Sequence, residues 1–360
     1  MRRGKLKSTL LLAAFAVVLL AGSISGYFSL ADKQPYRLDY HKAVINILVA
    51  YREELDSPTL GIGEKYLAED MAKEMAKYGV EAKVYTLEDS YANLNFNEGF
   101  EIYMRAYPEL NNGNIHKSFD EDRVAVLFET IPYESGEVYN VDMVFTGSLK
   151  KHKEYLKEGI ISHFLPQFTR FDKFYPAPRA EYKTKVLYVA NQWPDMETRK
   201  TIRYALKTGV ELDVYGKGWG DVLNGDKQNW WKKKQLPNEE LKYYYSSADI
   251  VLNDTRDDMI KAGFISNRIF DVTACKGFLI SDYIAEIEEI YGDSIPMYKT
   301  KEEFKELIDY YLAHPEERRE KAERAYQITR ERFGAEKVIK DMVQKMEAYR
   351  QERGLKSVGE

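Results

Sequence analysis

The stretch GFISNRIFDVTACKGFLISD, residues 263–282, decides how the second half of the chain folds. Within it, Asn267–Lys276 can form a helix, and the short apolar run Gly277–Ser281 has the character of a buried strand. The apolar run Ala248–Asn253 upstream predicts another strand. A strand, a helix and a second strand in this order predict a unit of parallel α/β structure.

The same alternation continues on both sides of this unit. Upstream, the pattern predicts a strand at Lys185–Ala190, a helix at Glu197–Lys207 and a strand at Glu211–Tyr215. Downstream, helices are expected at Glu302–Leu312, at the polar segment Glu316–Phe333 and at Glu336–Arg350. The second half is therefore predicted to be a Rossmann-like domain followed by C-terminal helices.

The first half of the chain repeats this pattern. Val44–Ala50 predicts a strand, Glu64–Tyr78 a helix with one apolar face, and Ala82–Leu87 the next strand. Further strand-like runs are Phe100–Met104, Val124–Phe128, Val141–Thr146 and Ile160–Leu165. The prolines within residues 166–184 indicate a hinge between domains. The predicted fold class is α/β, with two Rossmann-like domains.

The first thirty residues differ from the rest of the chain. Basic residues at positions 2, 3, 5 and 7 precede an apolar run, and residues 9–28 are about long enough to cross a bilayer as a helix. This pattern predicts a signal anchor or a cleaved signal peptide, with a buried soluble helix as the alternative. The charge bias favours a main domain on the extracytoplasmic or lumenal side, attached as a single-pass membrane protein or secreted after cleavage.

These features divide the chain into five predicted parts. They are a signal anchor or signal peptide at 1–31, a linker at 32–43, an N-terminal domain at 44–178, a C-terminal domain at 179–335 and a final helix at 336–360.

The overall composition excludes several classes of protein. The 360 residues carry a net charge of −5, which argues against broad nucleic-acid binding because phosphate recognition needs a positive field. A single cysteine cannot form an internal disulfide, and no Cys/His cluster has the spacing of a structural zinc site. The 28 tyrosines are weak support for carbohydrate stacking, because tyrosine also fills ordinary cores.

Two glycine-rich loops follow predicted strands, where open α/β sheets bind ligands. Gly61 and Gly63 would let backbone N–H groups approach an anionic or hydroxylated ligand at a helix start, although a simple tight turn explains them equally well. Gly216 begins a second loop in which Trp219 can stack on a nucleotide base or pack in the core. The Walker pattern of P-loop NTPases is absent.

Residues 263–282 carry a resemblance to a known family. Ser266, Arg268, Phe270, Ala274 and Gly277 match the C-terminal domain of GT-B glycosyltransferases, particularly the CgeB-like group, with an aspartate at position 271 where glutamate is usual. The similar pieces elsewhere are Ser246–Asn253, Tyr311–Arg318, Gly61–Ala68, Tyr78–Val80, Phe164–Thr169 and Phe174–Pro176. The resemblance implies a GT-B-like fold, in which two Rossmann-like domains face a cleft, and a last helix that crosses back to the first domain.

The resemblance also implies a function. A sugar would move from a nucleotide-diphosphate donor to a carbohydrate, lipid-linked or protein acceptor held mainly by the first domain. Ser266 belongs to the matched donor motif, Arg268 would pair with the donor diphosphate and Asp271 with the ribose hydroxyls. Asn191 and Arg199 occupy positions at which relatives contact the donor phosphates.

The resemblance to GT-B glycosyltransferases also bears on whether a metal or a cofactor is expected. The acidic run Asp120–Asp122 precedes a strand rather than following one, so it does not support the metal-binding motif of GT-A enzymes. We therefore expect a metal-independent site with no cofactor besides the donor substrate. The histidines at 116, 152 and 163 are isolated, and no catalytic base can be assigned.

Three alternatives remain open at this point. Arg268 and Asp271 can form an ordinary surface ion pair three residues apart on a helix. The chain can also be an extracytoplasmic two-lobed solute-binding protein, which combines a secretory segment with paired α/β domains. A third possibility is a catalytically inactive GT-B-fold binding protein, since Asp271 departs from the family pattern and Gly263 stands where many retaining relatives carry a first glutamate.

Overall fold

The computed structural model describes residues 44–49, 62–86, 100–104, 124–132, 138, 141–192, 197–233 and 236–354. All of them lie in one compact unit, Tyr40–Glu360. The predicted N-terminal hydrophobic helix and the linker before residue 44 lie outside the described residues.

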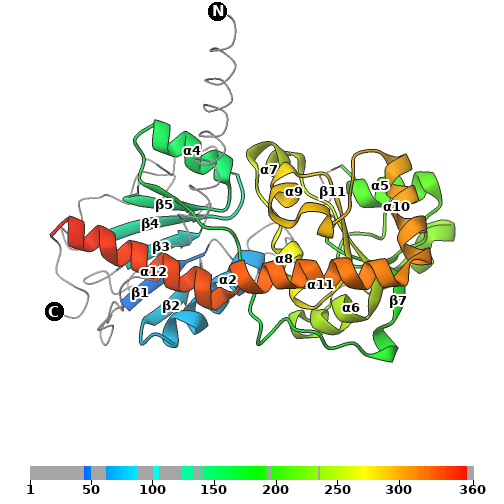
Figure 1. The fold of residues 1–360 in the computed structure, drawn as a ribbon, viewed down its shortest axis with the longest axis horizontal. Helices are drawn as coiled ribbons and strands as arrows, with labels where there is room; N and C mark the ends of the chain where they lie inside the picture. Colours follow the sequence, from blue (N-terminus) through cyan, green and yellow to red (C-terminus); the bar gives the residue numbers. More distant parts are fainter. Residues whose placement is uncertain are drawn as a thin grey trace, which may run out of the picture. The chain divides into compact units, whose positions relative to one another are not determined.

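The first half of the described chain forms a six-stranded parallel sheet in the order β2-β1-β3-β4-β5-β6 (Figure 1). The strands are β1 (Val44–Leu48), β2 (Glu81–Tyr85), β3 (Phe100–Met104), β4 (Val124–Glu129), β5 (Met143–Thr146) and β6 (Ser162–Phe164). Every residue of β4 is buried, as expected for a central strand covered on both faces. The sheet confirms the parallel α/β architecture predicted for this half.

Helices α2 (Ile62–Ala76) and α4 (Leu149–Lys157) accompany this sheet. On α2, Leu67, Met71 and Met75 are spaced by four residues, and all three are buried. Ser148 caps α4 because its hydroxyl accepts a hydrogen bond from the backbone N–H of Lys151 at 3.0 Å. The same hydroxyl donates to the carbonyl of Ala262 in the second half of the chain.

The second half forms another six-stranded parallel sheet, in the order β12-β11-β10-β7-β8-β9. Its strands are β7 (Thr184–Val189), β8 (Asp213–Tyr215), β9 (Trp231–Lys233), β10 (Ala248–Asn253), β11 (Leu279–Asp282) and β12 (Met297–Tyr298). The order reverses at β7 and β10, and such a reversal places a crevice at the carboxyl ends of the strands.

Helices pack around this second sheet. The α-helices are α5 (Lys200–Thr208), α6 (Leu241–Ser247), α7 (Asp257–Ala262), α8 (Asn267–Ala274), α9 (Ala285–Tyr291), α10 (Lys301–Ala313), α11 (Pro315–Arg332) and α12 (Ala335–Glu352). Short 3-10 turns lie at η4 (Ala180–Tyr182), η5 (Gly225–Trp230), η6 (Asn238–Glu240) and η7 (Gly292–Ser294). The helix–strand alternation predicted for residues 185–281 is therefore present.

The last two helices connect the two halves. In Figure 1, α11 is orange and α12 is red; α11 packs on α8, and α12 packs on α2. The hydroxyl of Tyr78, just after α2, donates to the carbonyl of Glu336 at 3.1 Å. At the other end of α12, the hydroxyl of Tyr349 donates to the Asp142 carboxylate at 3.2 Å. The predicted residue boundaries of the domains remain a prediction.

The predicted localisation needs correction. None of the helices in the described part of the chain combines the length and the apolar character needed to cross a bilayer. The longest of them, α11 and α12, have 18 residues each and carry charged side chains along their length. This finding overturns the predicted single-pass membrane or secreted localisation, while residues 9–28, on which that prediction rested, lie outside the described residues.

Candidate functional site

A cavity of about 340 Å³, here called the inner pocket, is lined by residues from both halves of the chain. The first turns of α2, the end of β4, the segment after β6, the η6 turn, α7 and the start of α8 all contribute to its wall. Its lining residues are Gly63, Glu64, Tyr66, Leu67, Asp70, Thr130, Ile131, Gln167, Phe168, Thr169, Arg170, Lys173, Phe174, Asn238, Met259, Ser266, Asn267 and Asp271.

Asp271 is the most buried carboxylate of the inner pocket, with 9% of its surface exposed. Its Oδ1 accepts a hydrogen bond from the hydroxyl of Thr169 at 2.8 Å, and its Oδ2 accepts one from the amide of Asn267 at 3.0 Å. Burial raises the pKa of Asp271 to about 7, although the Thr169 bond and the charge of Lys173 oppose that rise. This carboxyl group therefore changes its charge near neutral pH.

Two basic residues on the wall of the inner pocket are engaged by acidic neighbours. Asp70 on α2 accepts from Arg170 Nη1 at 3.0 Å and from Lys173 Nζ at 3.1 Å. Arg170 also pairs with Asp172. No local sequence pattern predicts this cluster, because Asp70 and Arg170 are 100 residues apart.

Ser266 and Arg268 stand at the start of α8. The Ser266 hydroxyl caps the helix by accepting from the backbone N–H of Arg268 at 3.4 Å. The side chain of Arg268 donates from Nη1 to Asn253 Oδ1 at 2.7 Å, at the carboxyl end of β10. Arg268 and Asp271 thus have different hydrogen-bond partners, and no ion pair within 4 Å joins them in the described structure.

Arg199 was expected at the donor phosphates, and the structure places it in a buried ion pair instead. Its guanidinium donates to Asp254 Oδ1 from Nε at 3.0 Å and to the Asp254 carbonyl from Nη2 at 2.9 Å. Asp254 also accepts from the Tyr188 hydroxyl at 2.7 Å and from the backbone N–H of Thr201 at 3.0 Å. Burial pushes the pKa of Asp254 upward, but the charge of Arg199 and the hydrogen bonds from Thr201 and Tyr188 together hold that pKa below its usual range.

The loop that begins at Gly216 folds back on the end of β7. Trp219 is fully buried, and its indole N–H donates to the carbonyl of Ala190 at 2.7 Å. The prediction that Trp219 stacks on a base is therefore wrong for this structure, because the ring belongs to the core. Asn191 also serves this loop, since its Oδ1 accepts from the backbone N–H of Lys217 at 2.9 Å. Gly216 has a φ of +134°, and a Cβ there would lie 1.9 Å from the Ala190 carbonyl oxygen.

Of the two glycines in the first predicted loop, Gly61 and Gly63, the structure describes one. Gly61 lies outside the described residues, whereas Gly63 lies in the first turn of α2 and lines the inner pocket. Gly63 is exposed, and a Cβ built on it would meet no atom within 4 Å. Protein packing does not require a glycine at this position.

Gly263 ends α7 and has a φ of +76°. A Cβ at this position would lie 2.4 Å from Glu286 Oε1, so a glutamate does not fit here without rearrangement. The backbone at position 263 thus favours glycine over the first glutamate of the paired-glutamate pattern.

His152 and His163 both contact neighbouring side chains of the protein. His152 is buried, with its Nδ1 3.1 Å from the Ser162 hydroxyl. Burial lowers the pKa of His163 to about 4, and its ring packs on Phe145 with centroids 5.4 Å apart. His116 and the acidic run at 120–122 lie outside the described residues. Within the described ranges, no group of three or more His, Cys, Asp or Glu residues is arranged to hold a metal ion.

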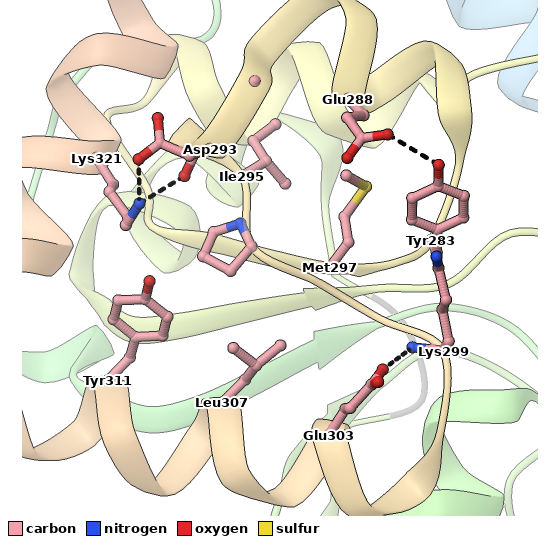
Figure 2. Close-up of a pocket in the computed structure, with 12 residues that line it drawn as sticks. Tyr283, Glu288, Asp293, Ile295, Met297, Lys299, Glu303, Leu307, Tyr311 and Lys321 are labelled. Carbon is pink, nitrogen blue, oxygen red and sulfur yellow. Dashed lines mark hydrogen bonds and ion pairs between the residues drawn. The ribbon is translucent and has the colours of Figure 1, made fainter.

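A larger cavity of about 560 Å³ lies at the β12 edge of the second sheet (Figure 2). Its polar groups satisfy one another: the Tyr283 hydroxyl donates to Glu288 at 2.8 Å, and Lys321 Nζ donates to Asp293 Oδ2 at 2.8 Å. None of the predicted site residues lines it. The inner pocket is therefore the better candidate for a ligand site.

Comparison with known proteins identifies the second half of the chain. Residues 197–344 match the family described as glycosyl transferase-like. These residues resemble a glycosyltransferase domain. The spore protein CgeB of Bacillus subtilis (strain 168) is 29% identical over 165 residues, which cover 41% of this chain and 49% of that protein. The chain thus spans about half the length of this curated relative, and the predicted CgeB-like relationship is confirmed.

Solved structures with a similar fold cover most of the chain. A sucrose-phosphate synthase from Thermosynechococcus elongatus aligns with a TM-score of 0.62 at 12% identity, over 88% of this chain and 100% of that one. HepE from Anabaena, solved with UDP and glucose, aligns with a TM-score of 0.60 at 11% identity, over 85% of this chain and 100% of that one. The chain has the GT-B-like α/β fold of these proteins.

Proposed function

We propose that this protein is a glycosyltransferase that moves a sugar from a nucleotide-diphosphate donor to an acceptor hydroxyl. The observation that carries the proposal is the inner pocket. Helices and loops of both halves of the chain line it, and Ser266, Asn267 and Asp271 come from α8 and its N-cap, within the residues that match the glycosyltransferase-like family. The GT-B-like fold supports the same reaction class, and HepE was solved with UDP and glucose.

In the reaction, the bond between the sugar's anomeric carbon and the donor phosphate oxygen breaks. A bond between that carbon and the acceptor oxygen forms, the nucleoside diphosphate leaves with the bonding electron pair, and the acceptor hydroxyl gives up its proton. Positive charge near the leaving diphosphate stabilises it. We assign this role to Arg268, which donates to the neutral side chain of Asn253 and forms no ion pair within 4 Å among the described residues.

The remaining site predictions form part of the same proposal. Asp271 would accept hydrogen bonds from the donor, and Gly63 would let a ligand approach the backbone at the start of α2. We propose that transfer needs no metal and no cofactor beyond the donor. The acceptor is proposed to be a carbohydrate, a lipid-linked molecule or a protein, bound mainly by the first half of the chain.

A binding protein of the same fold without transferase activity is the second candidate. Gly263 favours it, because its φ of +76° makes any side chain, including a first glutamate, strained at this position. The two-lobed solute-binding protein has lost its support, since the match of residues 197–344 is to a glycosyltransferase family.

The test is titration of the full chain with UDP, UDP-glucose, UDP-N-acetylglucosamine and GDP-mannose by thermal shift, because a ligand of the folded state raises its stability. We expect one nucleotide sugar to bind and Arg268→Ala to weaken it at least about tenfold, since a charge-assisted contact is lost. The exposed Arg319→Ala serves as the control. Release of free nucleoside diphosphate separates a transferase from a binding protein, and absence of binding by every nucleotide sugar would contradict both.

A further inference from the structure

Three residues on the wall of the inner pocket hold a buried side-chain oxygen that has no hydrogen-bond partner among the described residues. They are Thr130 Oγ1, Asn238 Oδ1 and Asn267 Oδ1. Buried polar atoms are nearly always hydrogen-bonded, because an unsatisfied one loses its hydration without compensation. Three such atoms on one cavity wall point to a ligand that supplies hydrogen-bond donors.

The orientation of the Asn267 amide is fixed by its neighbour. Its Nδ2 donates to Asp271 Oδ2 at 3.0 Å, while Asp271 Oδ1 accepts from the Thr169 hydroxyl at 2.8 Å. The amide oxygen must therefore face away from Asp271, and it needs a donor from elsewhere. Asp271 thus acts as a positioning residue for the Asn267 oxygen.

The other two oxygens come from separate parts of the chain. Thr130 follows directly after β4 and is only 2% exposed. Gln167 fixes its backbone by donating from Nε2 to the Thr130 carbonyl at 2.9 Å. Asn238 is the first residue of the η6 turn, in the second half of the chain. A ligand that reaches all three oxygens must lie across the pocket between the two halves.

The charges on the pocket wall exclude a phosphate group as that ligand. The basic residues Arg170 and Lys173 both donate to Asp70, which offsets their charge. Glu64 and Asp271 add further carboxyl groups, so the described residues of the wall carry no excess positive charge. A volume of about 340 Å³ is also at the small end of the roughly 300–1,000 Å³ of ligand pockets. The pocket suits a small neutral molecule with several hydroxyl groups.

We propose that the inner pocket binds one neutral sugar ring, whose hydroxyls donate to Asn238 Oδ1 and Asn267 Oδ1 and exchange a hydrogen bond with Thr130 Oγ1. The inference rests on the proposed function, because the ring belongs to the donor or to the acceptor. The donor diphosphate then lies outside this pocket, and Thr130 and Asn238 determine which sugar is accepted.

The test uses the full chain, wild type and four variants, titrated calorimetrically with UDP, UDP-glucose, UDP-N-acetylglucosamine and free glucose. Thr130→Val removes the hydroxyl with little change in shape, and Asn238→Ala removes the amide. The exposed Asn224→Ala is the matched control. For the sugar that wild type binds, Thr130→Val and Asn238→Ala each weaken affinity at least about tenfold and leave UDP affinity within about twofold. Asn238→Asp, which keeps an acceptor oxygen, retains most of the affinity.

The ligands separate the two sources of the ring. A loss confined to UDP-sugars assigns the pocket to the donor sugar, and a loss confined to free glucose assigns it to the acceptor. Equal losses for UDP and UDP-sugar, or no loss in either variant, overturn the inference while leaving the transferase proposal intact. Glucose binding that depends on Asn238 in a protein that binds no nucleotide supports the inference and refutes the transferase proposal. Absence of binding by all four ligands overturns both.

Discussion

Thr169, in the segment between the two sheets, donates a hydrogen bond from its hydroxyl to Asp271 Oδ1 on α8 at 2.8 Å. The backbone of Thr169 is held from the other side, because its N–H donates to the Phe333 carbonyl at 3.0 Å and its carbonyl accepts from the Ala335 N–H at 2.8 Å. One residue therefore ties the connecting segment both to the inner pocket and to the junction of α11 and α12.

Replacing Thr169 with valine removes this buried hydrogen bond and leaves Asp271 Oδ1 without its donor. We expect the free energy of unfolding to fall by about 1–3 kcal/mol in urea titrations at pH 8. The loss should be smaller at pH 5, because a protonated carboxyl is a weaker acceptor than a charged one. Thr169→Ser keeps the hydroxyl and is the control; an equal loss in both variants would assign the effect to packing.

Asp271 should also make stability depend on pH. Its pKa is raised to about 7 in the folded protein, so between about pH 4 and 7 the folded state keeps a proton that the unfolded chain releases. This group's contribution to stability is therefore greatest below pH 4, decreases as the pH rises and levels off above about 7. The decrease has an upper bound of about 4 kcal/mol.

Asp271→Asn should abolish that decrease, since asparagine does not titrate. Unfolding by urea at pH 5, 6, 7 and 8 measures it, and the difference between wild type and variant should shift in favour of the variant as the pH rises. Asp226→Asn, at an exposed position, corrects for the general effect of one removed charge. Parallel pH profiles for wild type and Asp271→Asn would show that Asp271 keeps an ordinary pKa.

Arg199 offers a direct choice between a structural and a ligand-binding role. Arg199→Ala leaves the carboxylate of Asp254 buried without its charged partner, and breaking such a pair costs about 3–5 kcal/mol. The exposed Arg319→Ala should change the free energy of unfolding by less than about 0.5 kcal/mol. If Arg199→Ala instead unfolds like wild type but loses nucleotide affinity, the residue binds phosphates as the sequence suggested.

Local pattern was enough to predict much of the fold. Val124–Phe128 was predicted as a strand because it is a short apolar run, and β4 covers Val124–Glu129. Helix Glu302–Leu312 was predicted from its apolar face, and α10 covers Lys301–Ala313. Buried parallel strands and amphipathic helices carry their signal within a few residues, so sequence alone identifies them.

The site was less predictable because its contacts join distant segments. Ser266 and Asp271 were found through a family pattern, and both line the inner pocket. The ion pair of Arg199 with Asp254 could not be predicted, because the two residues are 55 positions apart. Thr130 and Asn238 stand out only after folding brings them to the same wall. For Trp219 the sequence left base stacking and core packing open, and only the fold of the loop onto Ala190 selects core packing.

The last prediction concerns three glycines. Replacing each with alanine should change the free energy of unfolding by a different amount. Gly216→Ala places a Cβ 1.9 Å from a backbone oxygen at a φ of +134°, so strain and overlap together should lower the free energy of unfolding by roughly 2–5 kcal/mol. Gly225 has a φ of +55°, and a Cβ there would meet no described atom within 4 Å. Gly225→Ala should therefore lower the free energy of unfolding through backbone strain alone, by about 1–2 kcal/mol.

Gly63→Ala should have the opposite effect on stability. Its position is helical and open, so alanine raises the free energy of unfolding by up to about 1 kcal/mol. Because Gly63 lines the inner pocket, the same variant should lower affinity for the nucleotide sugar if a ligand approaches the backbone there. Urea unfolding and calorimetric titration of the three glycine variants measure both quantities. Higher stability with unchanged affinity would show that no ligand comes close to the start of α2.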